Sequence, residues 1–359
     1  MDKPATAKGW AQSYAPCEEG LRVPDSAQES AVSGELLRVE NLKTYITTRQ
    51  GIVRAVDGVS FSVARGQSVG LVGESGSGKT MTCMSLIRLL PSRSAEIVGG
   101  SVHFDGVDLL AQSESRLRHF RGRRIALIMQ DSLTSLNPVL RVGDQVGEPI
   151  RYHLKTKRPE TASRVVEVMS SLRVPASKQR LKQYPHQYSG GMRQRIVAAM
   201  GLGTMPELII ADEPTTALDV TTQAQFLTII REVQRESNVS VIWVTHDLGV
   251  TAQVCDRVNV MYAGRIVESG DVRRIFRDPK HPYTVALMQS IPVLGQKQKR
   301  LYQIKGQPPD VMNLPPGCPF APRCEHAMTI CGEQYPPATP VGEDGHVNCW
   351  LARPNAAGT

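Results

Sequence analysis

A glycine-rich stretch in the first quarter of the chain has the residue types and spacing of a loop that binds phosphate groups. Residues 73–80 fit the pattern G-x-x-x-x-G-K-[ST] and follow an apolar run that reads as a strand. Glycines let the backbone turn its N–H groups onto phosphate oxygens, and the start of a helix adds partial positive charge. Lys79 would place its charge on the β- and γ-phosphates, and Thr80 would give a hydroxyl to Mg²⁺. The residues expected to bind the nucleotide are Gly73, Glu74, Ser75, Gly76, Ser77, Gly78, Lys79 and Thr80.

Polar side chains that suit phosphate hydrolysis follow three later apolar runs. Asp212 and Glu213 end one run, and Gln130 and His246 follow two others. Asp212 could hold Mg²⁺, and Glu213 could polarise the attacking water as a general base. His246 could hydrogen-bond the γ-phosphate, and Gln130 could reach Mg²⁺ or the water. Taken singly, the acidic pair reads as a solvated strand end and the histidine as a structural one.

A second loop repeats the logic of the first at Ser189, Gly190 and Gly191. A small hydroxyl and exposed N–H groups would again lie at a helix N-terminus, where an anion is favoured. A Ser-Gly-Gly sequence alone is nearly always a turn. Its position between Gln130 and Asp212 gives it weight, because the whole set occurs in one order along the chain.

In that order the motifs resemble the ABC ATPase family over residues 36 to about 290. The resemblance implies that Ser189 contacts the γ-phosphate held by an opposite subunit, so that two chains sandwich two nucleotides. It also implies that Tyr45 stacks on adenine, although a core aromatic is the alternative. Tyr188 and Met192 replace the usual Leu and Gln of the signature motif, but the Ser and both Gly are intact. The implied motifs are the glutamine loop at Gln130, the signature at Ser189–Arg193, Walker B at Leu208–Glu213, the D-loop at Ala217–Asp219 with Asp219 at the nucleotide, and the switch His246.

Four of the seven cysteines gather near the C-terminal end with the spacing C-x₅-C-x₆-C-x₁₇-C. Such a cluster in a reducing compartment is more typical of a metal site than of disulfides. The spacing matches neither common zinc sites nor the usual ferredoxin patterns, and His326 or His346 could substitute as zinc ligands. Chemistry alone therefore leaves the metal open. The cysteines are Cys318, Cys324, Cys331 and Cys349.

The same region resembles the C-terminal extension of oligopeptide and dipeptide importer ATPases. The resemblance implies a [4Fe–4S] cluster with a structural role on the four cysteines, with zinc or free thiols as alternatives. The ending Ser290-Ile291-Pro292 favours the first of the two ATPase subunits that pair in these importers. The stretches that carry the resemblance are Leu71–Gly78, Thr134–Pro138, His281–Thr284, Gly306–Pro309 and Gly317–Cys324.

These motifs require an α/β fold, which we identify as a P-loop NTPase of ABC type with an antiparallel β subdomain, an inserted helical subdomain and a small Cys-rich extension. The expected divisions are a disordered extension at 1–34, a nucleotide-binding domain at 35–290 with helices at about 136–205, and the extension at 291–359. Strands alternating with helices predict a parallel sheet covered on both faces. Strands are predicted at Leu36–Tyr45, Val53–Val63, Ser68–Val72, Val98–Phe104, Ile125–Met129, Leu208–Asp212 and Val239–Thr245, and helices at Gly78–Leu90, Val220–Glu236 and Leu248–Cys255.

Composition narrows the setting of this fold. The chain has 359 residues and a formal charge of +8, but no run of five Lys or Arg, so we expect no nucleic-acid partner. No apolar stretch approaches the roughly 18 residues of a spanning helix, and no signal region follows the first lysine. We expect a peripheral protein at the cytoplasmic face of the inner membrane.

The resemblance implies an ATPase that uses ATP and Mg²⁺ to power import of oligopeptides or dipeptides. Its implied partners are a second ATPase subunit, identical or related, two membrane permease subunits and, indirectly, an extracytoplasmic solute-binding protein. A related importer for nickel, glutathione or another small solute is the alternative. A non-transport ABC ATPase or an exporter is disfavoured, since tandem nucleotide domains are absent and exporters lack a Cys-rich extension.

Overall fold

The computed structural model describes residues 34–130, 132–290 and 303–353. Residues 1–33 of the predicted N-terminal extension and residues 291–302, at the start of the predicted Cys-rich extension, lie outside this part of the chain. The chain divides into two compact units, and β8 (Ser240–Thr245) runs from one into the other. Of the described residues, unit 1 contains 34–36, Val63–Gln67 and those within Ala111–Ile242, and unit 2 contains Leu37–Ser62, Ser68–Leu110, 243–290 and 303–353.

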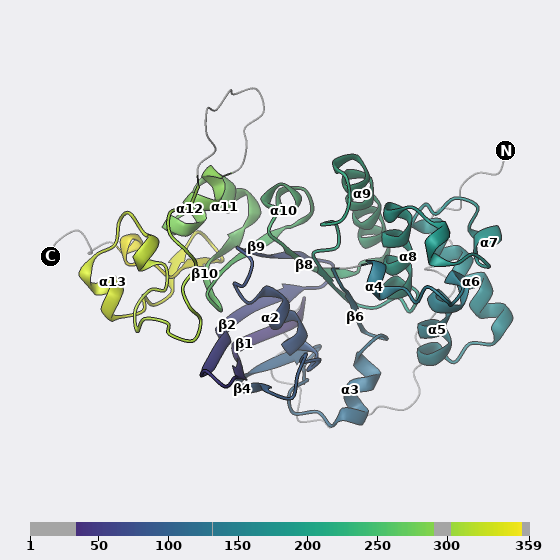
Figure 1. The fold of residues 1–359 in the computed structure, drawn as a ribbon, viewed down its shortest axis with the longest axis horizontal. Helices are drawn as coiled ribbons and strands as arrows, with labels where there is room; N and C mark the ends of the chain where they lie inside the picture. Colours follow the sequence, from purple (N-terminus) through teal and green to yellow (C-terminus); the bar gives the residue numbers. More distant parts are fainter. Residues whose placement is uncertain (1–33, 131, 291–302, 354–359) are drawn as a thin grey trace. The chain divides into compact units, whose positions relative to one another are not determined.

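Unit 1 is mainly helical, as the teal part of Figure 1 shows. Its helices α5, α6 and α8 pack on one another. In α5 the buried residues Val142, Val146 and Ile150 recur every four positions, which forms one apolar stripe. Between residues 136 and 205 every regular element that the structure describes is helical, in agreement with the predicted spacing. The helices are α3 (Glu114–Phe120), α4 (Ser132–Ser135), α5 (Val142–Leu154), α6 (Arg158–Ser171), α7 (Ser177–Arg180), η2 (Pro185–Gln187), α8 (Gly190–Leu202) and α9 (Val220–Ser237).

Two short strands of unit 1 carry predicted site residues at their carboxyl ends. Strand β6 (Ile125–Ile128) pairs in parallel with β7 (Leu208–Asp212), and every residue of β7 is buried. A strand covered on both faces reads as a continuous apolar run, which is why β7 was predicted residue for residue.

Unit 2 contains an antiparallel sheet, as predicted for the first part of the chain. The strand order is β2-β1-β4-β5, and β1 pairs with β4 so that Leu37 lies opposite Phe104. Both of these side chains are buried, and alternate residues of β1 and β4 face the same core. The strands are β1 (Glu35–Thr47), β2 (Ile52–Ala64), β4 (Ala95–Phe104) and β5 (Val107–Asp108).

The predicted parallel sheet is confirmed in part, because the other strands of unit 2 include a parallel pair and also an antiparallel series that we did not predict. Strand β3 (Ser68–Val72) is parallel to β9 (Arg257–Tyr262), but β9 pairs antiparallel with β10 (Arg265–Asp271). The chain reverses at Ala263 and Gly264, whose φ values of 46° and 80° are those of a tight hairpin turn. The antiparallel series was not predicted because β9 and β10 were not recognised as strands. The antiparallel series continues through β12 (Gly345–Val347) and β11 (Thr339–Val341).

Helix α2 (Lys79–Leu86) follows β3 and ends earlier than the predicted Leu90. Arg88 adopts a left-handed φ of 52°, which no α-helix can continue through.

Among the described residues, no helix has the length and apolar content to span a bilayer. The remaining helices of unit 2 are α10 (Leu248–Val254), α11 (Val272–Arg277), α12 (Pro282–Gln289), η3 (Ala321–Arg323), α13 (Thr329–Glu333) and η4 (Trp350–Ala352).

Candidate active site

The phosphate loop, Gly73–Thr80, connects β3 to α2 inside unit 2. Lys79 opens the helix with a side chain that is only 5% exposed, and its amine folds back over the loop. The Nζ donates to the carbonyl oxygens of Gly73 at 2.8 Å and Glu74 at 2.9 Å. An ammonium group is thereby held at the mouth of a helix N-terminus, which is the arrangement expected for a phosphate cradle.

Gly78 shows why the loop needs glycine. Its φ is 101°, and a Cβ added there would lie 2.3 Å from the carbonyl oxygen of Ala55. A side chain is therefore excluded by both backbone conformation and space. The predicted residues Ser75, Gly76 and Thr80 are exposed on the loop, and Ser77 is buried beneath it.

Tyr45 lies near the end of β1 with its hydroxyl fixed. The hydroxyl donates to Asp57 at 2.9 Å, and Arg265 donates to the other oxygen of Asp57 through two nitrogens, at 3.1 and 2.6 Å. Burial alone would raise the pKa of Asp57, but the hydrogen bonds and charge of Arg265 outweigh it and hold that pKa below its ordinary value. Tyr45 is only partly buried, and the Arg54 guanidinium lies over its ring, 6.0 Å from the centroid.

The acidic pair ends β7 in unit 1. Asp212 is buried at the strand end, whereas Glu213 takes a left-handed φ of 45° that points its side chain in another direction. Gln130 Nε2 donates to Glu213 Oε2 at 2.9 Å, and Thr216 Oγ1 donates to the same oxygen at 3.0 Å. The structure thus brings Gln130 and Glu213 together, as a shared role near one nucleotide requires, and adds Thr216, which sequence analysis did not single out.

The signature loop, Ser189–Gly191, lies at the start of α8, with Ser189 and Gly190 exposed and Gly191 half-buried against Thr222. The Ser189 side chain caps the helix by accepting from the N–H of Met192 at 3.4 Å. Gly190 has no other atom within 4 Å of the position that a Cβ would take. The loop therefore leaves room above the helix N-terminus within unit 1.

Asp219, the last residue of the D-loop, caps the next helix, α9, and is exposed. It accepts from the N–H of Thr222 at 3.0 Å and from its hydroxyl at 2.7 Å. These bonds hold the pKa of Asp219 below its ordinary value, so the side chain is an anion near neutral pH. His246 follows β8 in unit 2 and is also exposed.

The predicted site residues divide between the two units. Tyr45, the phosphate loop and His246 belong to unit 2. Gln130, the signature loop, Asp212, Glu213 and Asp219 belong to unit 1. Their convergence on one nucleotide stays a prediction.

The four predicted ligand cysteines line one small cavity in unit 2, which we call the cysteine cavity. Its volume is about 20 Å³, roughly the space of one water, and its lining is apolar apart from the thiols and two histidines. All four cysteines are unpaired as disulfides, and burial raises the pKa of Cys318 and Cys349 to about 11. No group of three or more His, Cys, Asp or Glu within the described residues is arranged to hold a metal ion.

One buried nitrogen in the cysteine cavity lacks a partner. His281 is fully buried at the start of α12, and its Nδ1 accepts from the N–H of Tyr283 at 3.0 Å. Burial lowers the pKa of His281 to about 3, so the ring is neutral and Nε2 carries its hydrogen. No described residue accepts from this Nε2.

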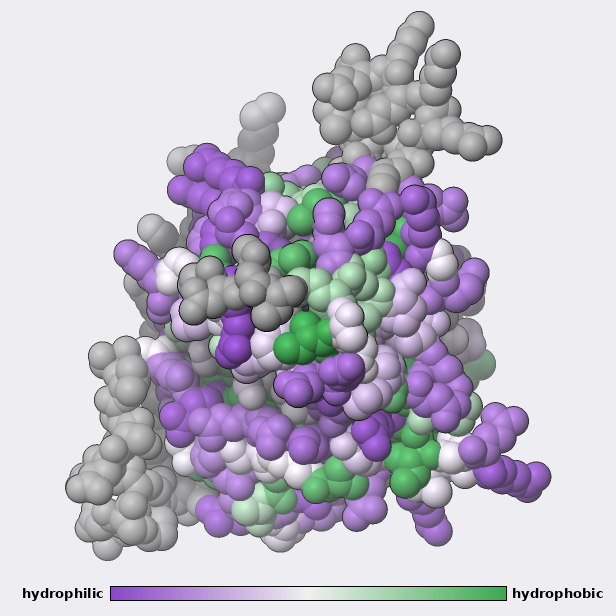
Figure 2. All heavy atoms as spheres, turned by 90° about the vertical axis from the view of Figure 1, so that its left-hand side faces the viewer, coloured by the Kyte–Doolittle hydropathy of each residue, from purple (hydrophilic) through white to green (hydrophobic). Residues whose placement is uncertain are grey.

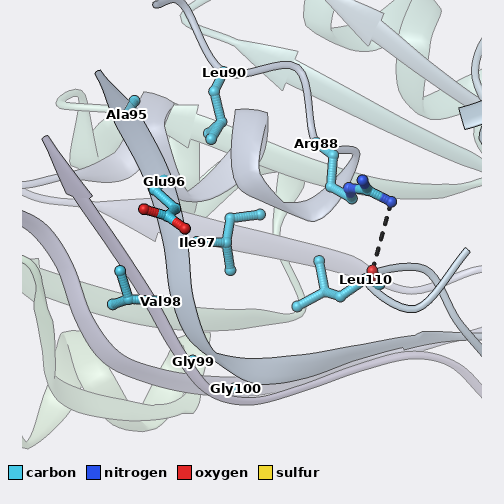
Figure 3. Close-up of a pocket in the computed structure, with 9 residues that line it drawn as sticks. All are labelled: Arg88, Leu90, Ala95, Glu96, Ile97, Val98, Gly99, Gly100 and Leu110. Carbon is cyan, nitrogen blue, oxygen red and sulfur yellow. Dashed lines mark hydrogen bonds between the residues drawn. The ribbon is translucent and has the colours of Figure 1, made fainter. Parts of the chain in front are cut away.

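A further cavity is lined by none of the predicted site residues. It has a volume of about 600 Å³ and is lined mainly by β4 residues together with Arg88 and Leu110. Figure 3 shows the Arg88 guanidinium pointing to the carbonyl oxygen of Leu110, at 3.5 Å. Its lining holds one carboxylate, Glu96, and no histidine or cysteine, so it offers little for catalysis.

Two family models match the chain. The model described as "ABC transporter" matches residues 56–216, and that described as "Oligopeptide/dipeptide transporter, C-terminal region" matches residues 267–331. The first spans the phosphate loop, signature loop and acidic pair. The second contains three of the four cysteines.

Curated proteins are similar over most of the chain. The Dipeptide transport ATP-binding protein DppD of Bacillus subtilis is 50% identical over 318 residues, 88% of this chain and 95% of that protein. The Oligopeptide transport ATP-binding protein OppD of Escherichia coli is 45% identical over 318 residues, 89% of this chain and 93% of that protein.

A solved structure shares the fold. The ATP-binding cassette MJ0796, a dimer in a post-hydrolysis state bound to ADP and Pi, aligns with a TM-score of 0.60 and 24% identity. The alignment covers 66% of this chain and 99% of that one.

Proposed function

From its membership of the ABC transporter family, to which this chain belongs, we infer that the protein is the ATP-hydrolysing subunit that powers an importer of dipeptides or oligopeptides. The observation that carries this is the 50% identity to a dipeptide transport ATP-binding protein across nearly the whole of both chains. The match to the oligopeptide transporter C-terminal model supports the same substrate class.

The site residues divide the work of hydrolysis. The phosphate loop holds the β- and γ-phosphates, with the Lys79 ammonium offsetting their charge and the ring of Tyr45 under the base. Thr80 and Asp212, with Gln130, would hold Mg²⁺. Water attacks the γ-phosphorus, the bond to the β-phosphate oxygen breaks, and Glu213 takes the proton from the water.

The remaining residues act across a dimer. Ser189, Gly190 and Gly191 would contact the γ-phosphate bound by a second ATPase subunit, and Asp219 would lie at the same interface. The exposure of the signature loop, with open space where a Gly190 side chain would be, supports this role. His246 would hydrogen-bond the γ-phosphate in its own chain and orient Glu213.

Membrane permease subunits would be the partners that convert nucleotide-driven closure of the ATPase dimer into transport. Apolar side chains in and near α5 support a docking surface in unit 1, since Val139 is 76% exposed and Tyr152 66% exposed. Leu140 is also exposed beside Val139. By contrast, the face that Figure 2 shows is mainly hydrophilic with small, separate apolar patches. The subunit would then sit at the cytoplasmic face of the membrane.

The cysteine cavity would hold a [4Fe–4S] cluster on Cys318, Cys324, Cys331 and Cys349. The donor set fits, because four thiols line one cavity and the orphaned Nε2–H of His281 could donate to a cluster sulfur. The present volume fits a single atom, so binding a cluster would require the surrounding loops to move outward. Bound there, a cluster would cross-link the loops of a segment poor in apolar core.

A purified protein tests the cluster directly. We expect a brown protein with about four irons per chain that loses colour on oxidation, and a Cys324→Ser variant with much less iron. A colourless protein with one zinc per chain would replace the cluster with a zinc site.

Transport tests the function itself. Co-expressed with its neighbouring membrane subunits in vesicles, the protein should drive ATP-dependent uptake of a labelled dipeptide. Uptake of nickel or glutathione in place of peptides would change the cargo but not the motor. Purification with ribosomes or DNA instead of integral membrane subunits would overturn the assignment.

A further inference from the structure

One residue of the phosphate loop is bound by the far end of the chain. Arg323 donates to Glu74 in a fork, from Nη1 to Oε2 at 2.7 Å and from Nη2 to Oε1 at 3.1 Å. The Arg323 side chain is 4% exposed and that of Glu74 28% exposed. Both residues lie in unit 2, although 249 positions separate them in the sequence. Paired charges in this geometry and depth are among the stronger polar contacts in proteins.

The same loop residue is also bound through its backbone. The Glu74 N–H donates to the hydroxyl of Tyr283 at 2.8 Å, and Tyr283 is fully buried in α12. Glu74 is therefore bound at both its backbone and its side chain by residues that follow the nucleotide-binding motifs.

The guanidinium of Arg323 is itself held in place. Its Nε donates to the carbonyl oxygen of Lys305 at 3.0 Å, and its Nη1 reaches the hydroxyl of Tyr262 at 3.2 Å. The rings of Tyr262, Tyr283 and Phe320 pack beneath it, with centroids 4.6 to 5.4 Å apart. A fork that is already aimed loses little freedom when it binds a carboxylate.

This contact matters for phosphate chemistry because Glu74 is an acid inside an anion-binding loop. An unpaired carboxylate there would repel the phosphates that Lys79 attracts, and it would leave the loop backbone free to shift. The Arg323 fork neutralises the carboxylate and fixes its direction. The alternative is that the contact only stabilises the packing of residues 303–353. In that case its loss would not alter nucleotide affinity.

We propose that Arg323 is a positioning residue for nucleotide binding, which neutralises Glu74 and fixes the phosphate loop, so that residues 303–353 and the nucleotide site are energetically coupled. The proposal rests on the proposed function in one respect, that Gly73–Thr80 binds ATP. Coupling is reciprocal, so nucleotide binding must in turn stabilise the segment around Arg323.

Variants that remove one or both charges of the Arg323–Glu74 pair test the proposal in the full chain. Titrating the subunit with a fluorescent ATP analogue and Mg²⁺, we expect Arg323→Ala to weaken binding about tenfold, the loss typical of a charged hydrogen-bonded pair. Arg323→Lys keeps the charge without the fork and should lie in between. Adding Glu74→Gln to Arg323→Ala should restore most of the lost affinity, because the double variant has neither an unpaired carboxylate in the loop nor an unpaired buried guanidinium.

Steady-state kinetics of the assembled transporter give a second readout. Arg323→Ala should raise the KM for ATP by a similar factor while leaving kcat at saturating ATP within about twofold, because the reacting groups are untouched. Should Arg323→Ala prove unstable, Arg323→Lys and the double variant Arg323→Ala with Glu74→Gln still decide the matter through the same titration.

Arg124 provides a matched control. It forms a fork to Glu207 in unit 1, whereas the phosphate loop belongs to unit 2. Arg124→Ala should change thermal stability but not ATP affinity. If Arg323→Ala lowers thermal stability without changing ATP affinity, or if adding Glu74→Gln fails to restore the affinity, Arg323 only stabilises the packing of residues 303–353. Absence of binding in the wild type would instead overturn the proposed function.

Discussion

The phosphate loop and the signature loop use the same residue types at a helix N-terminus, yet the structure treats them differently. The phosphate loop is packed into unit 2, with the Lys79 amine folded over its own carbonyls and Glu74 bound on two sides. In the signature loop of unit 1, Ser189 and Gly190 are exposed, and the Ser189 side chain caps α8. The phosphate loop is held by contacts within its own chain, whereas the signature loop presents exposed residues to which another molecule could bind.

This difference explains how one small motif serves two tasks. A loop that must bind a nucleotide from solution gains from rigidity, because fewer states have to be selected on binding. A loop that must meet a nucleotide carried by another subunit needs access and little side-chain bulk. The contrast predicts that changes in the two loops will have separable effects.

The largest expected effect separates hydrolysis from both loops. Glu213→Gln removes the general base while leaving the phosphate and signature loops intact, so ATP should still bind. Hydrolysis should fall on the order of 10²–10⁴-fold, the usual contribution of such a base. The chain should also elute as a dimer with ATP and as a monomer with ADP in size-exclusion chromatography. Near-normal turnover would remove Glu213 from this role.

A smaller effect should follow from placing charge on the signature loop. Ser189→Glu puts a carboxylate where a partner's γ-phosphate would lie, and we expect hydrolysis to fall about 10²-fold, as for loss of one anion-stabilising contact. ATP binding by the isolated subunit should not change, whereas Lys79→Ala should weaken that binding. A loss of binding in Ser189→Glu would show that the loop serves its own chain.

Ser113 supplies the control for that substitution. It caps α3 in unit 1 by accepting an N–H at 3.4 Å, the same distance as at Ser189. Ser113→Glu should lower stability by about the same amount, roughly 1 kcal/mol for a lost cap, without the fall in hydrolysis.

The smallest expected effects are on the free energy of unfolding, when a glycine of either loop is replaced by alanine. Gly78→Ala places a Cβ against the carbonyl of Ala55 in a left-handed conformation, and it should lower the free energy of unfolding by about 2 kcal/mol or more. Gly190→Ala meets no atom within 4 Å and should stay within about 0.5 kcal/mol. Chemical denaturation measures both. Equal losses at the two positions would contradict the contrast between a packed loop and an open one.

The sequence predicted the parts of the fold that depend on local patterns. Strands β3 and β7 match their predicted ranges because buried apolar runs with clear ends leave no alternative. The helical spacing between residues 136 and 205 was equally clear. The β9–β10 hairpin was missed because its turn requires a left-handed φ at Ala263. Alanine rarely adopts that conformation, so the residue type gave no signal of a turn.

The site was predictable to a similar limit. Motif order located the phosphate loop, and the four cysteines that the resemblance implied as ligands line one cavity. The contacts of Glu74 with Tyr283 and Arg323 could not be predicted. Each joins residues more than 200 positions apart, and such pairs leave no local periodic signal.

The Arg323–Glu74 contact also has a consequence for the birth of the protein on the ribosome. At about 5–20 residues per second, the 249 positions between the two residues take roughly 12–50 s to translate. Through that interval the nascent phosphate loop lacks its arginine. A growing or prematurely terminated chain would hold ATP weakly, and tight nucleotide capture would begin only once translation has passed Arg323.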